Sequence, residues 1–419
     1  MVIGLMIGSG IFRVPSSIAA EAGSAPAILT VWVLGGIICL CGALSLAELA
    51  TIFPHAGGQY VFLRQTYGPL VAFLYGWTFL LVSPNVWAAL ALIFAGYLNT
   101  FVPLGENGTR IAAAALIVVV SAANYRSVSF GASIQSVSTI AKVLALVGLA
   151  STIFIVGRHG AEPVAAAAPA ALDWGSLGLA LISVIFAYGG WSEFTGLAGE
   201  VRDPGRNLPV ALAAGTGTVI IVYVIVNAAY LTALPAQAVA SSTFVAADAM
   251  TRTVGPAGAS IVSALVMLST FGALCGAALA FPRVFYAMGQ DEVLFRSLAA
   301  VHPRFLTPHR AIAFTAAVAL IYVSARTFEQ LAEAMVIGTE PFNVLLVLAV
   351  LLLRRTRPRL PRPYRIPGYP VAPVVFLLAM IGVLLNALLE HPGSTLLSVG
   401  ITLLGVPIFA VLRGFVSKN

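Results

Sequence analysis

Glycine residues interrupt two apolar segments of this 419-residue chain, at Gly8-Ser9-Gly10 and at Tyr188-Gly189-Gly190-Trp191. A helix that unwinds at the first interruption frees backbone N–H groups at the positive end of the following half-helix, and such groups suit a carboxylate. The second interruption frees carbonyls at the negative end of a half-helix, and these suit an ammonium group. Together the two breaks predict a site for the carboxylate and the amino group of an α-amino acid.

Each break also has a simpler interpretation. Small residues such as those of the first break let helices pack closely. Tyr188 and Trp191 fit either a binding or gating role or ordinary packing. Because breaks in both the first and the sixth segment are typical of secondary transporters, their pairing favours the binding site.

Lys142 is one of two lysines in the chain and lies inside the apolar segment 134–157. An ammonium group within a membrane is costly unless it has partners or faces a cavity. We expect it to bridge carbonyls of the first segment and the hydroxyls of Ser269 or Thr270, in the place of a sodium ion. The alternative is that the side chain extends to the membrane interface.

Glu48, Glu193 and Glu340 also lie in apolar segments. A buried carboxyl group inside a membrane fits a carrier of a coupling proton. Glu48, together with Glu200, equally fits ion pairs with basic loops at an inner gate. The spacing of these residues does not rank the two roles.

The chain that must position these residues is 60% hydrophobic and 9% charged, with a mean hydropathy of +0.99. Such values lie outside the range of soluble domains, and the apolar runs repeatedly reach membrane-spanning length. We therefore predict an all-α integral membrane protein with a single transmembrane domain over 1–419. The twelve predicted spans are 1–22, 28–53, 69–98, 109–125, 134–157, 175–197, 209–232, 257–287, 310–326, 328–353, 370–388 and 393–414.

Within this domain we expect one repeat over about 1–157, a second over about 175–353 and two extra helices over about 370–414. Seven residues precede Gly8, so the first half-helix is short, which predicts a missing upstream segment.

The net charge of +7 is distributed as a membrane topology signal rather than as a nucleic-acid-binding surface. With the N-terminus inside, the inner loops and the C-terminal end hold sixteen Arg and Lys residues and the outer loops hold four. This bias predicts a multi-pass protein of the cell membrane with both termini in the cytoplasm. The three cysteines lie within spans at no metal-site spacing and the histidines do not cluster, so we expect no metal and no cofactor.

Several stretches are similar to those of a known family. They are residues 4–12 (GLMIGSGIF), 53–60 (FPHAGGQY), 186–191 (FAYGGW), 200–209 (EVRDPGRNLP), 283–289 (RVFYAMG) and 362–370 (RPYRIPGYP). They cover nearly the whole chain and resemble the amino acid–polyamine–organocation superfamily, most closely its L-type amino acid transporter branch. The resemblance implies a twelve-helix, five-plus-five inverted-repeat fold like that of LeuT, with unwound helices 1 and 6 and alternating access.

The resemblance also implies roles for single residues. Main-chain N–H groups of Ser9, Gly10 and Ile11 would bind the substrate carboxylate. The amino group would be received by the carbonyls of Ile7, Phe186, Ala187 and Gly189. Lys142 matches the lysine of sodium-independent members, and Tyr188 or Trp191 would help to occlude the substrate. The loop 101–110 (FVPLGENGTR) lacks the cysteine that links animal members to a heavy chain, so no disulfide-linked partner is expected.

The leading hypothesis is therefore a sodium-independent transporter of L-amino acids that works by exchange or by proton coupling. Neutral substrates are favoured because the breaks contain no acidic residue, although Glu193 lies one helical turn from Gly189. A cationic amino acid or a polyamine is the alternative substrate class. A non-transporting membrane sensor is the alternative from a different class, while the absence of an H-E-x-x-H motif or clustered histidines argues against an enzyme.

Overall fold

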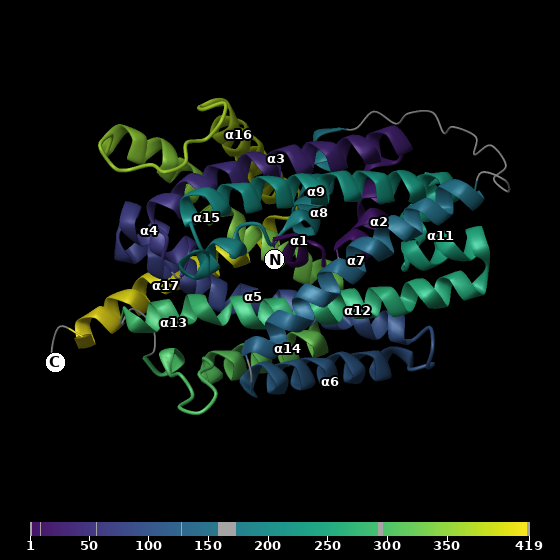
Figure 1. Ribbon diagram of the computed structural model, residues 1–419, viewed down its shortest axis with the longest axis horizontal. Coiled ribbons are helices and arrows are strands. Elements are labelled where there is room, and N and C mark those ends of the chain that lie inside the picture. Colours follow the sequence, from purple (N-terminus) through teal and green to yellow (C-terminus); the bar gives the residue numbers. More distant parts are fainter. Residues whose placement is uncertain are drawn as a thin grey trace.

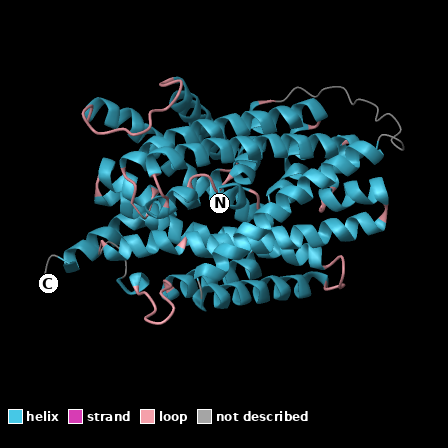
Figure 2. Cartoon of the chain, in the orientation of Figure 1, coloured by secondary structure: helices cyan, strands magenta, loops and turns pink. Residues whose placement is uncertain are grey.

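The computed structural model describes residues 2–8, 10–55, 57–126, 128–157, 173–291 and 296–416. Throughout these residues the regular elements are helices joined by loops (Figure 2). Most of the long helices run side by side along one direction, which makes the molecule a bundle (Figure 1). The all-α prediction is therefore confirmed.

The first part of the chain forms the helices α1 to α7. Their bounds are α1 (Val2–Met6), α2 (Gly10–Ala22), α3 (Ala25–Ile52), α4 (Gln59–Tyr67), α5 (Pro69–Leu98), α6 (Gly105–Arg126) and α7 (Val128–Val156).

The second part begins at α8 and ends at α15. The bounds are α8 (Trp174–Tyr188), η2 (Glu193–Glu200), α9 (Pro204–Ala233), α10 (Ala236–Ser241), α11 (Val245–Val254), α12 (Pro256–Ala280), α13 (Pro282–Gln290), η3 (Arg296–Ala299), α14 (His309–Ala325) and α15 (Phe328–Thr356). Two further helices, α16 (Val371–Glu390) and α17 (Pro392–Val416), complete the described chain.

Ten helical segments within the described residues are long and apolar enough to cross a membrane. The two other predicted spans appear as the pair α1 and α2 and as the shorter apolar helix α14. The helix ends differ from the predicted ends by a few residues; for example, α6 begins at Gly105, ahead of the predicted start at 109. Propensity and hydropathy do not determine where the last turn of a helix ends.

The first and sixth spans are both broken where the sequence predicts. α1 ends at Met6 and α2 begins at Gly10, while α8 ends at Tyr188 and η2 begins at Glu193. α1 lies at the centre of the bundle, and α2 packs against α8 (Figure 1). The unwound segments therefore lie in the protein interior, where irregular backbone is tolerated within a membrane.

Glycine is required where the two breaks meet. A Cβ atom added to Gly10 would lie 2.5 Å from the Cα of Ala187. Gly190 has a φ of +104°, and a Cβ atom on it would lie 2.6 Å from the carbonyl oxygen of Leu5. Any side chain would push the two broken helices apart, so these glycines fix their close approach.

Candidate functional site

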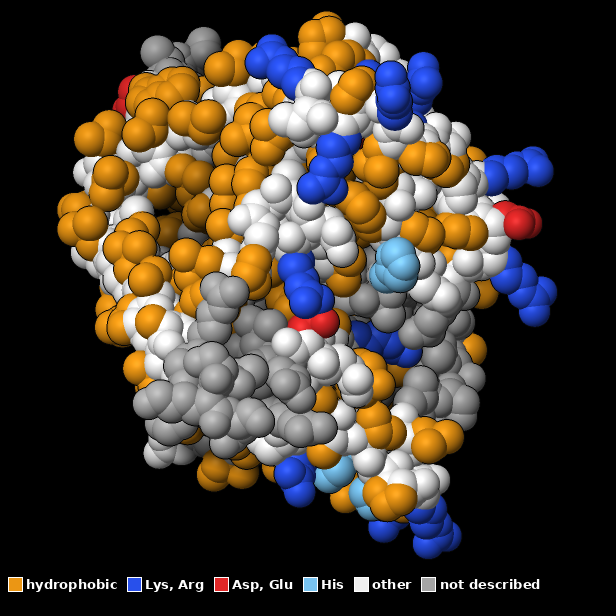
Figure 3. All heavy atoms as spheres, turned by 90° about the vertical axis from the view of Figure 1, so that its left-hand side faces the viewer, with side chains coloured by type: hydrophobic (Ala, Val, Ile, Leu, Met, Phe, Trp, Pro, Cys, Tyr) orange, Lys and Arg blue, Asp and Glu red, His pale blue; other side chains and the backbone are white. Residues whose placement is uncertain are grey.

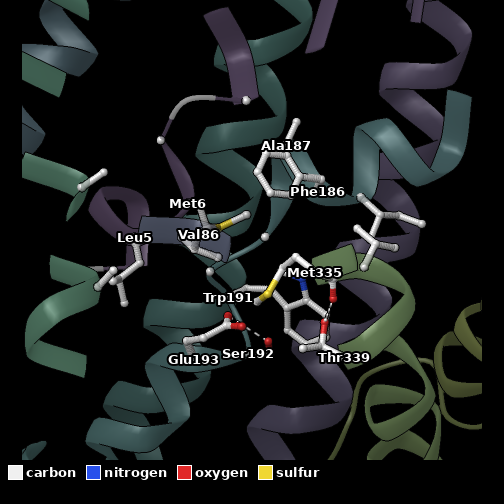
Figure 4. Close-up of a pocket in the computed structure, with 18 of the residues that line it drawn as sticks. Leu5, Met6, Val86, Phe186, Ala187, Trp191, Ser192, Glu193, Met335 and Thr339 are labelled. Atoms are coloured by element: carbon white, nitrogen blue, oxygen red, sulfur yellow. Dashed lines mark hydrogen bonds between the residues drawn. The ribbon is translucent and has the colours of Figure 1, made fainter. Parts of the chain in front are cut away.

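Both breaks open into one cavity, which with its mouth holds about 800 Å³ of empty space. Its walls come from the first break, α5, the second break with the start of η2, α12 and α15. Figure 4 shows labelled side chains from several of these elements arranged around this space. The residues that line it are Leu5, Met6, Gly8, Gly10, Val86, Leu90, Ile185, Phe186, Ala187, Gly189, Gly190, Trp191, Ser192, Glu193, Ala273, Ala277, Phe281, Met335, Val336, Thr339, Glu340 and Asn343.

The first break offers hydrogen-bond donors to the cavity. Gly8 and Gly10 line it, and α2 begins at Gly10, so the first N–H groups of α2 have no carbonyl partner within their own helix. The first turn of α2 contains no acidic side chain that would compete for these groups. Ile7 and Ile11 are fully buried and are not among the described residues that line the cavity, and the carbonyl of Ile7 accepts a hydrogen bond from Lys142. Ser9, the third expected donor, lies outside the described residues.

The second break offers acceptors. The last carbonyls of α8, up to Tyr188, have no partner further along the helix. One of them, the carbonyl of Phe186, accepts the N–H of Gly189 at 3.1 Å. Phe186, Ala187 and Gly189 all line the cavity, so the negative end of α8 faces the positive end of α2 across the same space.

The two aromatic residues of the second break lie differently. Trp191 lines the cavity and meets Phe376 of α16 edge to face, with the ring centroids 6.1 Å apart. Tyr188 is not part of the wall: its hydroxyl donates to the carbonyl of Trp32 at 3.1 Å, and its ring contacts Trp32 and Tyr223. Of the two roles left open for Tyr188, a binding or gating role and ordinary packing, the structure shows packing, because its side chain lies against α3 and α9.

Phe186 is the aromatic residue at the end of α8 that lines the cavity. Its ring lines the central cavity and also a second cavity bordered by Ser17, Glu21 and Glu333. It packs edge to face on Phe328 at the start of α15, with the centroids 5.7 Å apart. The aromatic pair therefore lies between the two cavities. From the sequence, only the carbonyl of Phe186 was expected to contact the substrate. Which ring faces the cavity depends on the rotation of α8, which the sequence does not show.

Lys142 is 2% exposed and extends from α7 to α1. Its ammonium donates to the carbonyl of Gly4 at 2.8 Å and to that of Ile7 at 2.6 Å. These bonds exclude the alternative in which the side chain extends to the membrane interface.

The expected contacts of Lys142 with α12 are not formed among the described residues. The hydroxyl of Thr270 donates to the carbonyls of Val266 and Met267 in its own helix. Ser269 is buried, and within the described part of the chain its hydroxyl has no partner. Lys142 therefore links α7 to the first break, and the expected bridge to Ser269 and Thr270 is corrected.

The three intramembrane glutamates fall into two groups. Glu193 and Glu340 line the cavity. Glu48 does not: it is fully buried on α3 and accepts two hydrogen bonds from Arg354, at 2.9 and 2.6 Å, and one from the N–H of Ile366 at 3.0 Å. Of the two roles expected for Glu48, a proton carrier or a partner in an ion pair, the contacts with Arg354 correspond to the ion pair. The side chain of Glu200 lies outside the described residues.

A hydrogen-bonded chain behind Glu340 was not foreseen. The hydroxyl of Tyr75 donates to the Oε1 of Gln59, whose Nε2 donates to the Oδ1 of Asn343 at 3.3 Å. The Nδ2 of Asn343 then donates to the Oε1 of Glu340 at 3.1 Å. The spacing of Asn343 one helical turn after Glu340 is the one signal in the sequence that points to this pairing.

The sequence model of the family described as amino acid permease matches residues 1–409. The chain belongs to the amino acid permease family. The permease is 31% identical to the serine/threonine exchanger SteT of Bacillus subtilis, over 98% of this chain and 94% of that protein. It is 30% identical to the human b(0,+)-type amino acid transporter 1, over 94% and 81% of the two chains.

A third relative is the human large neutral amino acids transporter small subunit 2, which is 32% identical over 98% of this permease and 78% of its own length. These relatives are amino acid transporters by name. The permease is accordingly a multi-pass membrane protein that transports amino acids, and its two broken spans agree with the fold that the resemblance implied.

Proposed function

We propose that this permease exchanges amino acids across the cell membrane without sodium. The observation that carries the proposal is that both helix breaks open into one cavity, so that donors of α2 and acceptors of α8 face the same ligand. A zwitterion satisfies both ends at once. The α-carboxylate binds the N–H groups of residues 9–11, and the amino group binds the carbonyls of residue 7 and residues 186–189.

Lys142 makes a sodium ion unnecessary in this proposal. A sodium ion at a broken helix is held by backbone carbonyls. Here the ammonium of Lys142 already holds the carbonyls of Gly4 and Ile7 at 2.8 and 2.6 Å. These two hydrogen bonds keep the first break in its binding geometry whatever the sodium concentration.

The orientation follows from the basic residues. Figure 3 looks onto the end of the bundle that holds α4, α13 and the C-terminal end of α17, and many Lys and Arg side chains lie on it with few acidic ones. By the positive-inside rule this end faces the cytoplasm. We further propose that residues 1–157 and 175–353 form the two inverted repeats, and that the permease works without a disulfide-linked heavy chain, since the loop 101–110 contains no cysteine.

The substrates include neutral amino acids in this proposal, because the two α-groups are bound by main chain that is indifferent to the side chain. The relatives named for serine and threonine and for large neutral amino acids support this range. Exchange is favoured over proton coupling by the name of the first relative, which is an exchanger.

The test is uptake of labelled L-serine and L-leucine into sodium-free proteoliposomes containing the purified permease. Vesicles preloaded with unlabelled amino acid are expected to take up label much faster than empty ones. If the rate of uptake is the same in preloaded and empty vesicles and depends on a sodium gradient, both the exchange mechanism and the role of Lys142 are contradicted. Uptake into empty vesicles driven by an inward proton gradient would replace exchange by symport.

A further inference from the structure

Two carboxylates face the substrate cavity without a basic partner. Glu193 stands at the start of η2 and Glu340 on α15, and no Lys, Arg or His is among the described residues that line the cavity. The two carboxylates are close enough to repel each other. The carboxylate of Glu193 accepts a hydrogen bond from the hydroxyl of Ser192 at 2.9 Å and is also bonded by backbone N–H groups of its own segment. The described lining of the cavity therefore holds two carboxyl groups and no basic side chain.

The hydrogen-bonded side chains behind Glu340 all donate in the direction of its carboxyl group. The hydroxyl of Tyr75 donates to Gln59, and the amide of Gln59 donates to Asn343. The amide of Asn343 then donates to the Oε1 of Glu340. These hydrogen bonds connect α5, α4 and α15, so they also fix the position of Glu340.

The second oxygen of Glu340 has no partner. Its Oε2 atom accepts no hydrogen bond from any described residue, although the residue is only 7% exposed. An unpaired carboxylate oxygen inside a protein is expensive, and the cost is relieved when a cationic donor binds it. Lys142 does not provide that donor, because its ammonium bonds to the carbonyls of Gly4 and Ile7.

A proline changes the backbone of α15 directly beside Glu340. Pro341 follows Glu340 within α15 and has no N–H, so the carbonyl of Ile337 loses its partner in the helix. A further acceptor is thereby freed one turn before Glu340.

We infer that Glu340 and Glu193 form an acidic subsite that binds the positively charged side chain of a basic amino acid while the two helix breaks hold its α-groups. The inference rests on the proposed function, since it adds a third contact to the same ligand. Neutral amino acids still bind through the breaks, but they leave the Oε2 of Glu340 unpaired. The permease therefore prefers arginine and lysine to neutral amino acids of equal length.

The test compares ligands that differ in charge but not in size. Competition binding to the purified permease uses L-arginine against L-citrulline and L-lysine against L-norleucine. A charge-assisted hydrogen bond to a buried carboxylate predicts that each basic ligand binds about 10- to 100-fold more tightly than its neutral partner. The Glu340→Gln variant keeps the shape of the side chain and is expected to reduce both ratios to about 3 or less.

Two controls make the result specific. Glu106→Gln alters an exposed carboxylate on α6, far outside the cavity lining, and is expected to leave both ratios as in the wild type. Glu193→Gln is expected to reduce the ratios as well, which separates an acidic subsite from an effect of Glu340 on folding. Agmatine, which is arginine without the carboxylate, is expected to bind more weakly than arginine; equal binding would identify the ligand as an amine rather than an amino acid and overturn the inference.

The remaining outcomes separate the inference from the proposed function. Equal affinity for arginine and citrulline in the wild type, with both bound, would overturn the acidic subsite and leave amino acid exchange intact. Ratios that are unchanged in Glu340→Gln would also overturn it. Loss of proton-driven uptake of a neutral amino acid in Glu340→Gln, without any preference for arginine, would assign the carboxyl group to proton transfer instead. Binding of no amino acid at all would refute the proposed function and the inference together.

Discussion

The role of Lys142 leads to a quantitative prediction for the variant Lys142→Met. Methionine keeps the unbranched, helix-compatible shape but removes the ammonium group, so the bonds to Gly4 at 2.8 Å and to Ile7 at 2.6 Å are lost. Hydrogen bonds between helices in membranes contribute about 0.6 kcal/mol on average and at most about 1.7 kcal/mol. Losing two of them destabilises the first break by about 1 to 3 kcal/mol.

This cost falls mainly on substrate binding. α1 has only five residues, and another hydrogen bond to it comes from the hydroxyl of Tyr223, which donates to the carbonyl of Met6 at 3.1 Å. If the whole cost is needed to restore the break before the ligand binds, the Kd rises by about 5- to 150-fold. Tyr223→Phe removes one neutral bond to the same segment and provides the matched comparison, with an expected rise of about threefold.

The assay is direct binding of a labelled amino acid to purified wild-type and variant permease in sodium-free buffer, with added sodium as a second condition. The reasoning predicts the order wild type, Tyr223→Phe, Lys142→Met for increasing Kd. A wild-type Kd in Lys142→Met would refute the role of the ammonium. A Kd that sodium restores in this variant would show that a metal ion can occupy the position of the ammonium, which supports the substitution.

Two further predictions concern the close approach of the breaks and the contact of Glu48. Gly10→Ala places a methyl group 2.5 Å from the Cα of Ala187 and is expected to lower the stability by about 1 to 3 kcal/mol. In Gly8→Ala the atom nearest to the new methyl group lies at 3.6 Å, so the thermal midpoint in detergent is expected to stay near that of the wild type. Equal midpoints for the two variants would contradict the packing argument. Glu48→Gln leaves the guanidinium of Arg354 without its carboxylate and is expected to lower the stability by about 3 kcal/mol, measured by the same unfolding assay; an unchanged midpoint would show that the ion pair is dispensable.

Much of the fold follows from the sequence because membrane spans are encoded in single runs of apolar residues. The breaks could be predicted equally well, because Gly10 and Gly190 mark positions where two backbones approach closely. Lys142 could be singled out because a charged residue within an apolar run needs a partner.

The directions of side chains could not be read in the same way. Tyr188 and Phe186 are two residues apart, and the rotation of α8, which is set by packing against α3 and α15, decides which ring faces the cavity. The pairing of Gln59 with Asn343 joins residues 284 positions apart in the chain. Such contacts depend on the arrangement of whole helices, and neither periodicity nor spacing contains that information.

The central claim is that one amino acid is held by its carboxylate at the first break and by its amino group at the second. The most direct test is exchange in sodium-free, serine-loaded proteoliposomes with labelled L-serine outside, challenged by unlabelled L-serine, N-acetyl-L-serine or L-serine methyl ester. We predict that L-serine competes and that both blocked forms compete at least about tenfold more weakly, because each loses a charged hydrogen-bond partner. Competition by either blocked form as strong as that of serine would contradict the assignment of the corresponding break.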